Sequence, residues 1–190
     1  GQHCNISAPT RIDDVLLMHW INNLQELERL LKKHDKQKIF LDLPINRIKP
    51  PNNKYTLNDL ISVISSYNQI KYFAISNVES ANDLEDYIQK IPPNIILVPK
   101  IESPIAIQNV SEIVNAIPTD EHALMLDHAD LFSTRIRHNE SIDSFQNQLQ
   151  KLSDYCNSNK IRLLRTIGVI FSDEEIRLSQ DSNGYFMKCG

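Results

Sequence analysis

The chain has 190 residues, a formal net charge of −4 and 41% hydrophobic residues. This length supports one hydrophobic core, so we expect a single domain over residues 1–190. The weak acidic charge gives no reason to expect a nucleic-acid partner. No apolar run approaches the ~20 residues of a membrane span, so no membrane partner is expected either.

The numbers and positions of the cysteines and glycines exclude further kinds of binding site. The three cysteines, Cys4, Cys156 and Cys189, lie outside any metal-binding spacing, and no signal-peptide pattern is present, so we expect a reduced, cytoplasmic setting. Only four glycines occur, and of these only Gly168 and Gly184 are internal. A Walker loop or a dinucleotide fingerprint needs several glycines at fixed spacing, so neither device can be present.

Strand and helix patterns alternate along the chain. Six strands are predicted, at Asp14 to Trp20, Lys38 to Leu43, Lys71 to Ser76, from Ile95, at Ala123 to Asp127, and at Ile161 to Phe171. Helices are predicted at Leu24 to His34, from a Thr56 cap to about Tyr67, from a Ser80 cap to about Ile91, from Pro104 to about Ala116, and at Ser141 to Asn157. Asn5–Ser7 and Tyr185–Cys189 are weaker strand candidates. This alternation predicts a parallel sheet with outer helices, in a barrel or an open doubly wound sheet.

The fourth predicted strand ends in two charged residues, Lys100 and Glu102, which are two apart and therefore lie on one face. The next residue, Ser103, is predicted to be the N-cap of a helix. Carboxyl ends of parallel strands are where barrel enzymes hold their chemistry. Glu102 and Asp130 would project from neighbouring strand ends, close enough to share one hard cation. From the residues alone, a Lys100–Glu102 ion pair with Asp130 as a helix cap also stays open.

A family resemblance rests on five segments in order. They are Leu41 to Lys49, Tyr72 to Asp83, Lys100 to Glu102 with Asn109 to Ile113, Leu124 to Leu131, and Gln148 to Thr166. Together they resemble the catalytic barrel of pyruvate kinase, whose motifs include KIEN and IMVARGDL. They are also similar to the wider phosphoenolpyruvate/pyruvate superfamily, which includes metal-dependent aldolases of the HpcH/HpaI type and citrate lyase β-type enzymes.

The resemblance implies a fold, a cofactor and a ligand. The implied fold is α/β, a shortened or incomplete TIM-type (β/α) barrel of parallel strands with outer helices, since a complete barrel takes ~250 residues. Glu102 and Asp130 would bind Mg²⁺ or Mn²⁺, with Lys100 as the catalytic residue. The ligand would be a small 2-oxo acid or enol phosphate. The substrate-binding positions implied are Ala129, Asp130, Thr166 and Arg47.

The sequence departs from pyruvate kinase at three places. The strand Val15–Ile21 lacks the kinase's arginine, asparagine and serine, and leaves His19 as its titratable group. Only Pro50 to Tyr55 stands where the kinase inserts its nucleotide-covering lid domain. The kinase's ARGD becomes the run from Asp127 to Asp130, in which Asp127 is either a third metal ligand or a solvated strand-end acid.

Three functions are therefore open. The first is a divalent-metal-dependent enzyme that acts on a pyruvate- or phosphoenolpyruvate-like substrate through an enolate, as a lyase or aldolase. The second is a degenerate pyruvate kinase-like phosphotransferase domain, and the third is a non-catalytic binding or regulatory domain that retains the barrel. Since exposed sheet edges favour pairing, we also expect a homo-oligomer or a part of a larger chain.

Overall fold

In the described part of the chain, seven parallel strands in sequential order form one sheet. The computed structural model describes residues 15–19, 21, 23–43, 55–167 and 186–188, and gives only the backbone of residues 19, 128, 129, 166, 167 and 186–188. The strands are β1 (Leu16–His19), β2 (Ile39–Asp42), β3 (Ile70–Ile75), β4 (Ile96–Ile101), β5 (Ala123–Leu126), β6 (Arg162–Ile167) and β7 (Phe186–Lys188). Each strand pairs in parallel with the next along the chain.

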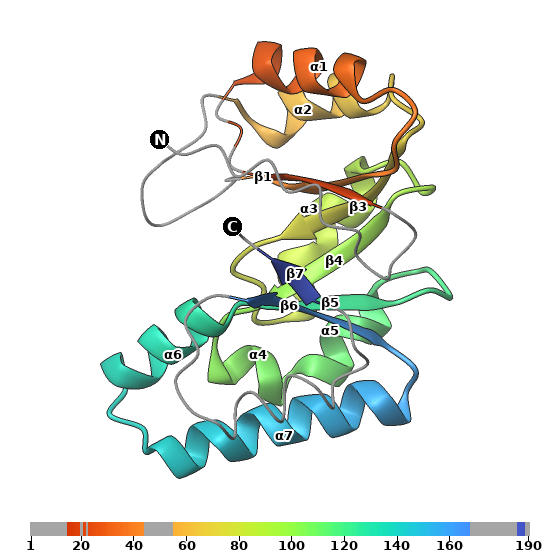
Figure 1. The fold of residues 1–190 in the computed structure, drawn as a ribbon. Coiled ribbons are helices and arrows are strands. Elements are labelled where there is room, and N and C mark those ends of the chain that lie inside the picture. Colours follow the sequence, from red (N-terminus) through yellow and green to blue (C-terminus); the bar gives the residue numbers. More distant parts are fainter. Residues whose placement is uncertain (1–14, 20, 22, 44–54, 168–185, 189–190) are drawn as a thin grey trace.

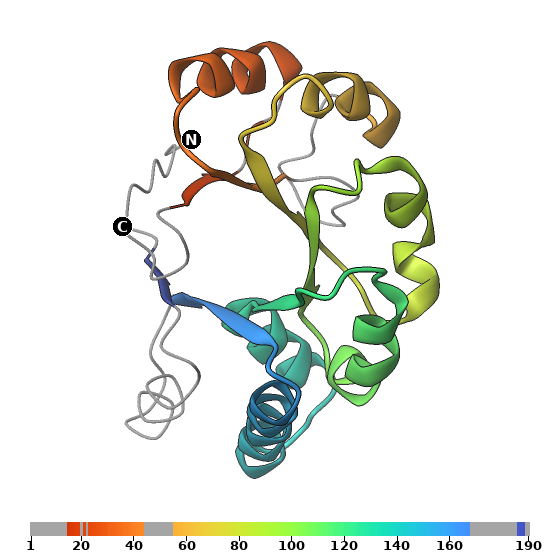
Figure 2. The same cartoon turned by 90° about the vertical axis from the view of Figure 1, so that its right-hand side faces the viewer.

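Helices connect these strands and cover one side of the sheet (Figure 1). They are α1 (Leu24–Lys33), α2 (Leu57–Ile64), the 3₁₀ turn η1 (Ala81–Leu84), α3 (Glu85–Lys90), α4 (Pro104–Gln108), α5 (Val110–Ala116), α6 (His128–Arg137) and α7 (Ile142–Ser158). Figure 2 shows the strands curling into an arc with the helices outside, open between β1 and β7 in the described part of the chain. The predicted α/β incomplete barrel of parallel strands with outer helices is thus confirmed.

The period of two along each strand divides the core into two layers. Leu41 and Leu97 belong to the outer apolar cluster, which packs between the sheet and the helices. Phe40 and Val98, their neighbours in sequence, belong to a second cluster inside the arc. The inside of the arc is therefore filled mainly by apolar side chains.

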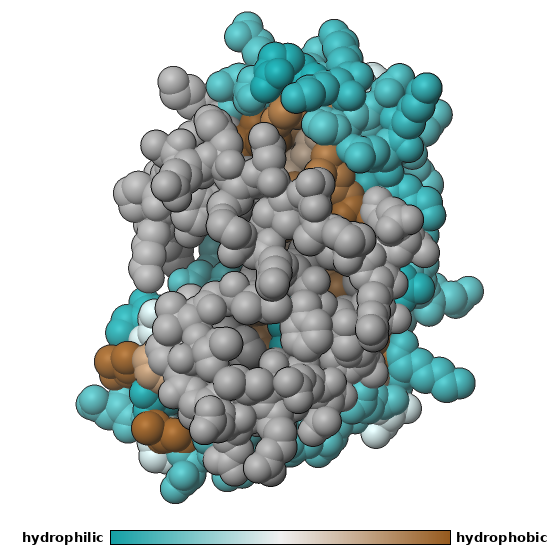
Figure 3. Space-filling model, in the orientation of Figure 1, coloured by the Kyte–Doolittle hydropathy of each residue, from teal (hydrophilic) through white to brown (hydrophobic). Residues whose placement is uncertain are grey.

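Capping side chains in the local sequence determine where several helices begin. The Asn23 side chain accepts a hydrogen bond from the Glu26 backbone N–H at the start of α1, whose outer face is hydrophilic (Figure 3). Thr56 and Asp59 form the predicted capping box of α2, with both reciprocal hydrogen bonds present. No helix in the described ranges is long and apolar enough to cross a membrane.

Three predicted elements differ in detail. The helix expected from Pro104 to Ala116 is divided at Asn109 into α4 and α5. The Asn109 side chain donates to the carbonyl of Glu79, which fixes the loop after β3 at this break. Helix α6 was not predicted as a helix. The C-terminal strand candidate contains β7, whereas Asn5–Ser7 lies outside the described residues.

Candidate metal centre and active site

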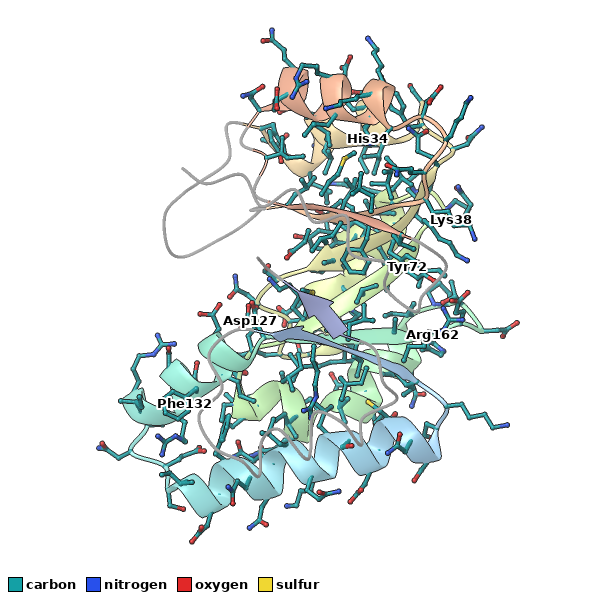
Figure 4. All side chains as sticks on the ribbon, in the orientation of Figure 1. His34, Lys38, Tyr72, Asp127, Phe132 and Arg162 are labelled. Carbon is teal, nitrogen blue, oxygen red and sulfur yellow. The ribbon has the colours of Figure 1, made fainter. Side chains whose placement is uncertain are left out.

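Three charged side chains continue the inward-facing rows of the arc at the carboxyl ends of β2, β4 and β5. Asp42, Lys100 and Asp127 each lie two residues beyond an apolar member of the inner cluster. Figure 4 shows Asp127 at one end of the strands and Arg162 at the opposite end. The parallel arrangement therefore brings acids and a lysine from distant parts of the sequence to one end of the sheet.

Lys100 lies between three carboxylates. Its Nζ is 3.4 Å from Oδ1 of Asp42, 3.6 Å from Oε1 of Glu102 and 3.9 Å from Oδ2 of Asp127. Its side chain is only 10% exposed. Burial on its own would lower the pKa of Lys100, but the three negative charges and the hydrogen bond to Asp42 outweigh it and raise the pKa above its usual value. The ammonium therefore stays charged at neutral pH.

Glu102 follows β4, and its carboxylate is held by a hydrogen bond from the backbone. Its Oε2 accepts a hydrogen bond from the Asn77 backbone N–H at 2.7 Å. Burial raises the pKa of Glu102, and the charges of Asp127 and Asp130 add to this effect, whereas Lys100 and the Asn77 N–H oppose it. The carboxylate thus has a definite orientation but an unfavourable excess of negative charge around it.

Asp127 and Asp130 both lie at the start of α6. Asp127 is the N-cap, and its Oδ1 accepts from the Asp130 backbone N–H at 3.2 Å. Asp127, not Asp130, is therefore the helix cap. With its side chain 19% exposed, Asp127 is also not the solvated acid that one interpretation expected. One carboxylate oxygen from each of Glu102, Asp127 and Asp130 lies within 4.8 Å of the others, and we call these three residues the carboxylate cluster.

Thr134 joins the two elements that carry the cluster. Its hydroxyl donates to the carbonyl oxygen of Asp130 at 2.9 Å, and the carbonyl oxygen of Glu102 is 3.3 Å away. Thr134 is itself buried. The first turn of α6 is thereby held against the end of β4.

The predicted site residues have different outcomes. Lys100, Glu102 and Asp130 lie together, as expected. At Asp130, which is also an implied substrate-binding position, the backbone N–H donates to Oδ1 of Asp127. The remaining predicted positions are Ala129 and Thr166, of which only the backbone is described, and Arg47, which lies outside the described residues.

Two residues of the site were missed from the sequence. Asn77 acts through its backbone N–H, and the one sequence signal for its conformation is the tolerance of asparagine for positive φ. Thr134 lies one helical turn after Asp130, where a hydroxyl can bond back to a carbonyl four residues earlier. Neither signal points to a site without knowledge of α6 and of the loop after β3.

The arrangement is suited to a hard cation. The carboxylates of Asp42, Glu102 and Asp127 lie within 4 Å of the Lys100 ammonium, and the carboxylate of Asp130 adds a further negative charge beside Glu102 and Asp127. Small divalent cations such as Mg²⁺ prefer carboxylate oxygen ligands. A cation held by the cluster would offset both the burial of Glu102, which is the main cause of its raised pKa, and the repulsion from Asp127 and Asp130 that adds to it.

Comparison with known proteins identifies relatives of the fold. No family model and no curated protein sequence matches the chain. Among solved structures, RipC from Yersinia pestis is 17% identical with a TM-score of 0.62, over 93% of this chain and 83% of RipC. An HpcH/HpaI aldolase/citrate lyase family protein from Burkholderia cenocepacia is 12% identical with a TM-score of 0.61, over 93% and 79%.

A third similar structure is larger. The magnesium/glyoxylate complex of Haloferax volcanii malate synthase is 9% identical with a TM-score of 0.62, over 86% of this chain and 56% of the synthase. The chain therefore spans little more than half of that enzyme. At these identities the likeness shows a shared fold and no more. The resemblance to pyruvate kinase itself stays a prediction.

Proposed function

We propose that this chain is a divalent-cation-dependent enzyme that acts on a small 2-oxo acid through an enolate, with lyase or aldolase chemistry. The carboxylate cluster would hold Mg²⁺ or Mn²⁺. The observation that carries the proposal is the convergence of three carboxylate oxygens within 4.8 Å at the carboxyl ends of barrel strands. In (β/α) barrels, this end of the strands holds the active site.

The chemistry of the carboxylate cluster by itself, without reference to similar structures, suits a divalent cation. The side chains of Glu102 and Asp127 are 13% and 19% exposed, so their charges are poorly solvated. The ammonium of Lys100 is drawn toward Asp42 as well, and so compensates the cluster only in part. A bound divalent cation would supply positive charge beside the oxygen on which an enolate develops its negative charge.

The similar structures support the substrate class. One of them is a malate synthase in complex with magnesium and glyoxylate, which is a small 2-oxo acid. Another is an aldolase/citrate lyase family protein. These properties belong to those proteins, and we transfer them here because this chain shares their fold and places acids at the end of the strands where such barrels hold their active sites.

The chain's own residues would then have distinct roles. Lys100 keeps its proton at neutral pH, so it would contribute positive charge beside the substrate and would not act as a base. Asn77 and Thr134 hold Glu102 and the start of α6. Ala129, Thr166 and Arg47 are proposed to contact the substrate, Arg47 from the segment between β2 and α2.

Calorimetric titration of Mn²⁺, with and without oxalate as an enolpyruvate mimic, tests the proposal. We expect binding that oxalate strengthens. Loss of a residue that only supports a metal ligand costs ~10-fold or more in affinity, so Glu102→Gln and Asp130→Asn should cost at least as much. Glu85→Gln, a change at an exposed acid of α3, is the matched control and should bind as the wild type does.

Two reaction assays separate the functions. In D₂O with Mg²⁺, the enolate proposal predicts that the methyl proton signal of pyruvate is lost in the presence of the protein and kept when EDTA is added. Formation of pyruvate from phosphoenolpyruvate and ADP would instead support the phosphotransferase. Absence of both Mn²⁺ binding and an oxalate effect would contradict the proposal and leave the non-catalytic binding domain.

A further inference from the structure

Asn77 has an unusual backbone conformation beside the carboxylate cluster. Its φ is 58°, in the left-handed region, two residues after the end of β3. Within the described ranges, the other non-glycine residues with positive φ are Asn139 and Lys160. Residues with a Cβ atom adopt this conformation at an energetic cost, which asparagine bears better than most. The structure around Asn77 must therefore favour the conformation.

This conformation directs the Asn77 N–H at Glu102. The N–H donates to Oε2 over 2.7 Å, a short distance for a hydrogen bond to a carboxylate. The other oxygen, Oε1, is the atom that lies 3.6 Å from Lys100 Nζ. The two oxygens of Glu102 therefore have different partners, one in the main chain and one at the centre of the site.

The loop that carries Asn77 is anchored at two points that follow α4 in the chain. The Asn109 side chain donates to the carbonyl of Glu79 at 2.8 Å. The Ala81 N–H donates to Oε1 of Glu112 at 2.9 Å. These contacts lie two and four residues after Asn77 and tie the loop to the break between α4 and α5 and to α5 itself. The Asn77 N–H is thus held in place by elements outside the carboxylate cluster.

We infer that Asn77 is a positioning residue for cation binding. Its left-handed backbone holds Oε2 of Glu102, and this fixes the carboxylate with one oxygen within 4.8 Å of oxygens of Asp127 and Asp130. Without this hydrogen bond, the Glu102 carboxylate would be free to rotate, and the cluster would lose a fixed ligand oxygen. The inference rests on the proposed divalent-cation site and adds to it a residue whose side chain need not touch the cation.

The test is a calorimetric Mn²⁺ titration of the intact chain and of three variants. Asn77→Val places a β-branched residue in the left-handed region and should weaken Mn²⁺ binding by about tenfold, the usual effect of losing a group that orients a metal ligand. Asn77→Gly accepts the conformation freely and keeps the N–H, so it should recover most of the affinity. Asn139→Val is the matched control.

The control separates positioning from stability. Asn139 has φ 52° and follows the end of α6 at Arg137, which lies about 10 Å from Asp130 along the helix at ~1.5 Å per residue. Both valine variants should lower the urea midpoint by a similar amount, because each forces the same side chain into the same backbone region. Only Asn77→Val should alter the affinity for Mn²⁺. If that variant does not fold, Asn77→Ala should show a smaller weakening in the same direction.

Each outcome decides one question. If the wild type binds no Mn²⁺, the proposed function fails, and the inference fails with it. If the wild type binds and Asn77→Val binds equally well while losing stability like Asn139→Val, only the inference is overturned. If Asn77→Gly is as weak as Asn77→Val, the side chain matters and the backbone account is wrong.

Discussion

Glu102 lies between opposing charges at the carboxyl end of β4. Burial and the acids Asp127 and Asp130 raise its pKa, and Lys100 and the Asn77 N–H only partly reverse this. An acid whose pKa is higher in the folded than in the unfolded state stabilises the fold below its ordinary pKa. This contribution is lost as the pH rises through the folded-state value. At neutral pH, the cation-free site is therefore electrostatically costly to the protein.

A carboxyl titration of the cation-free protein checks this account. Carbon-13 NMR of the side-chain carboxyls should show Glu102 titrating above 4.5, its ordinary value. Asp59, in the capping box of α2, provides an internal control, because its hydrogen bonds to Thr56 lower its pKa below 3.8. Since a cation needs ionised Glu102, Mn²⁺ affinity should fall as the pH drops through the Glu102 midpoint. A Glu102 midpoint at or below 4.5 would contradict the description.

At the residue scale, the sequence indicated most of the candidate site. Lys100 and Glu102 follow a buried strand at a spacing of two, and Asp130 follows the next strand along. Asp127 was left open between a third metal ligand and a solvated acid, but it could have been placed in the site by the same rule, since it continues the inward row of Ala123 and Met125. Asn77 could not, because its contribution depends on a φ angle that the fold imposes.

At the scale of elements, Asp42 and Lys100 connect strands that are not neighbours in the sheet. Asp42 ends β2 and Lys100 lies near the end of β4, with β3 between them. Their side chains are 5% and 10% exposed. Breaking this buried ion pair would leave an uncompensated charge, which is costly. Because the pair joins β2 to β4 across β3, it helps to fix the curvature of the arc at its carboxyl end.

A double-mutant cycle measures this contact. For Asp42→Asn and Lys100→Met, urea unfolding in EDTA should give a coupling free energy of about 1–3 kcal/mol. Lys90 and Asp86 form a shorter pair, at 2.7 Å, but their side chains are 36% and 58% exposed. Because solvent screens it, the coupling of that pair should be below about 0.5 kcal/mol. Equal coupling in the two cycles would show that burial does not strengthen the Asp42 contact.

The differences between the predicted and the observed elements have identifiable causes. Helix α6 has only Leu131, Phe132 and Ile136 as large apolar residues, and Ile136 is exposed, so no apolar face was evident. The break at Asn109 comes from a contact with the loop after β3, which no local pattern shows. Helix α7 was predicted because its buried leucines repeat along one face.

At the scale of the whole molecule, polar groups occupy both ends of the arc, separated by the inner apolar cluster. At the amino ends of the strands, Arg162 lies 2.9 Å from Glu121, and both contact the hydroxyl of Tyr72 at 3.1 Å (Figure 4). In this network every charge has an opposite partner. The carboxyl end, with its excess of acids, is the end suited to bind a cation.

The sequential strand order followed from the alternation of strands and helices, because parallel neighbours need a crossover between them. The opening between β1 and β7, seen among the described residues, did not follow from that pattern, since closure depends on the number and tilt of all strands. Homo-oligomerisation and completion by a larger chain both stay predictions.

The most direct test of the divalent-cation site is diffraction from crystals soaked in MnCl₂, measured at a wavelength where manganese scatters anomalously. We predict one strong anomalous peak in coordinating contact with carboxylate oxygens of Glu102, Asp127 and Asp130, and its loss in crystals of Asp130→Asn. A peak only at other acids, or none at these three while the crystals diffract well, would contradict the account.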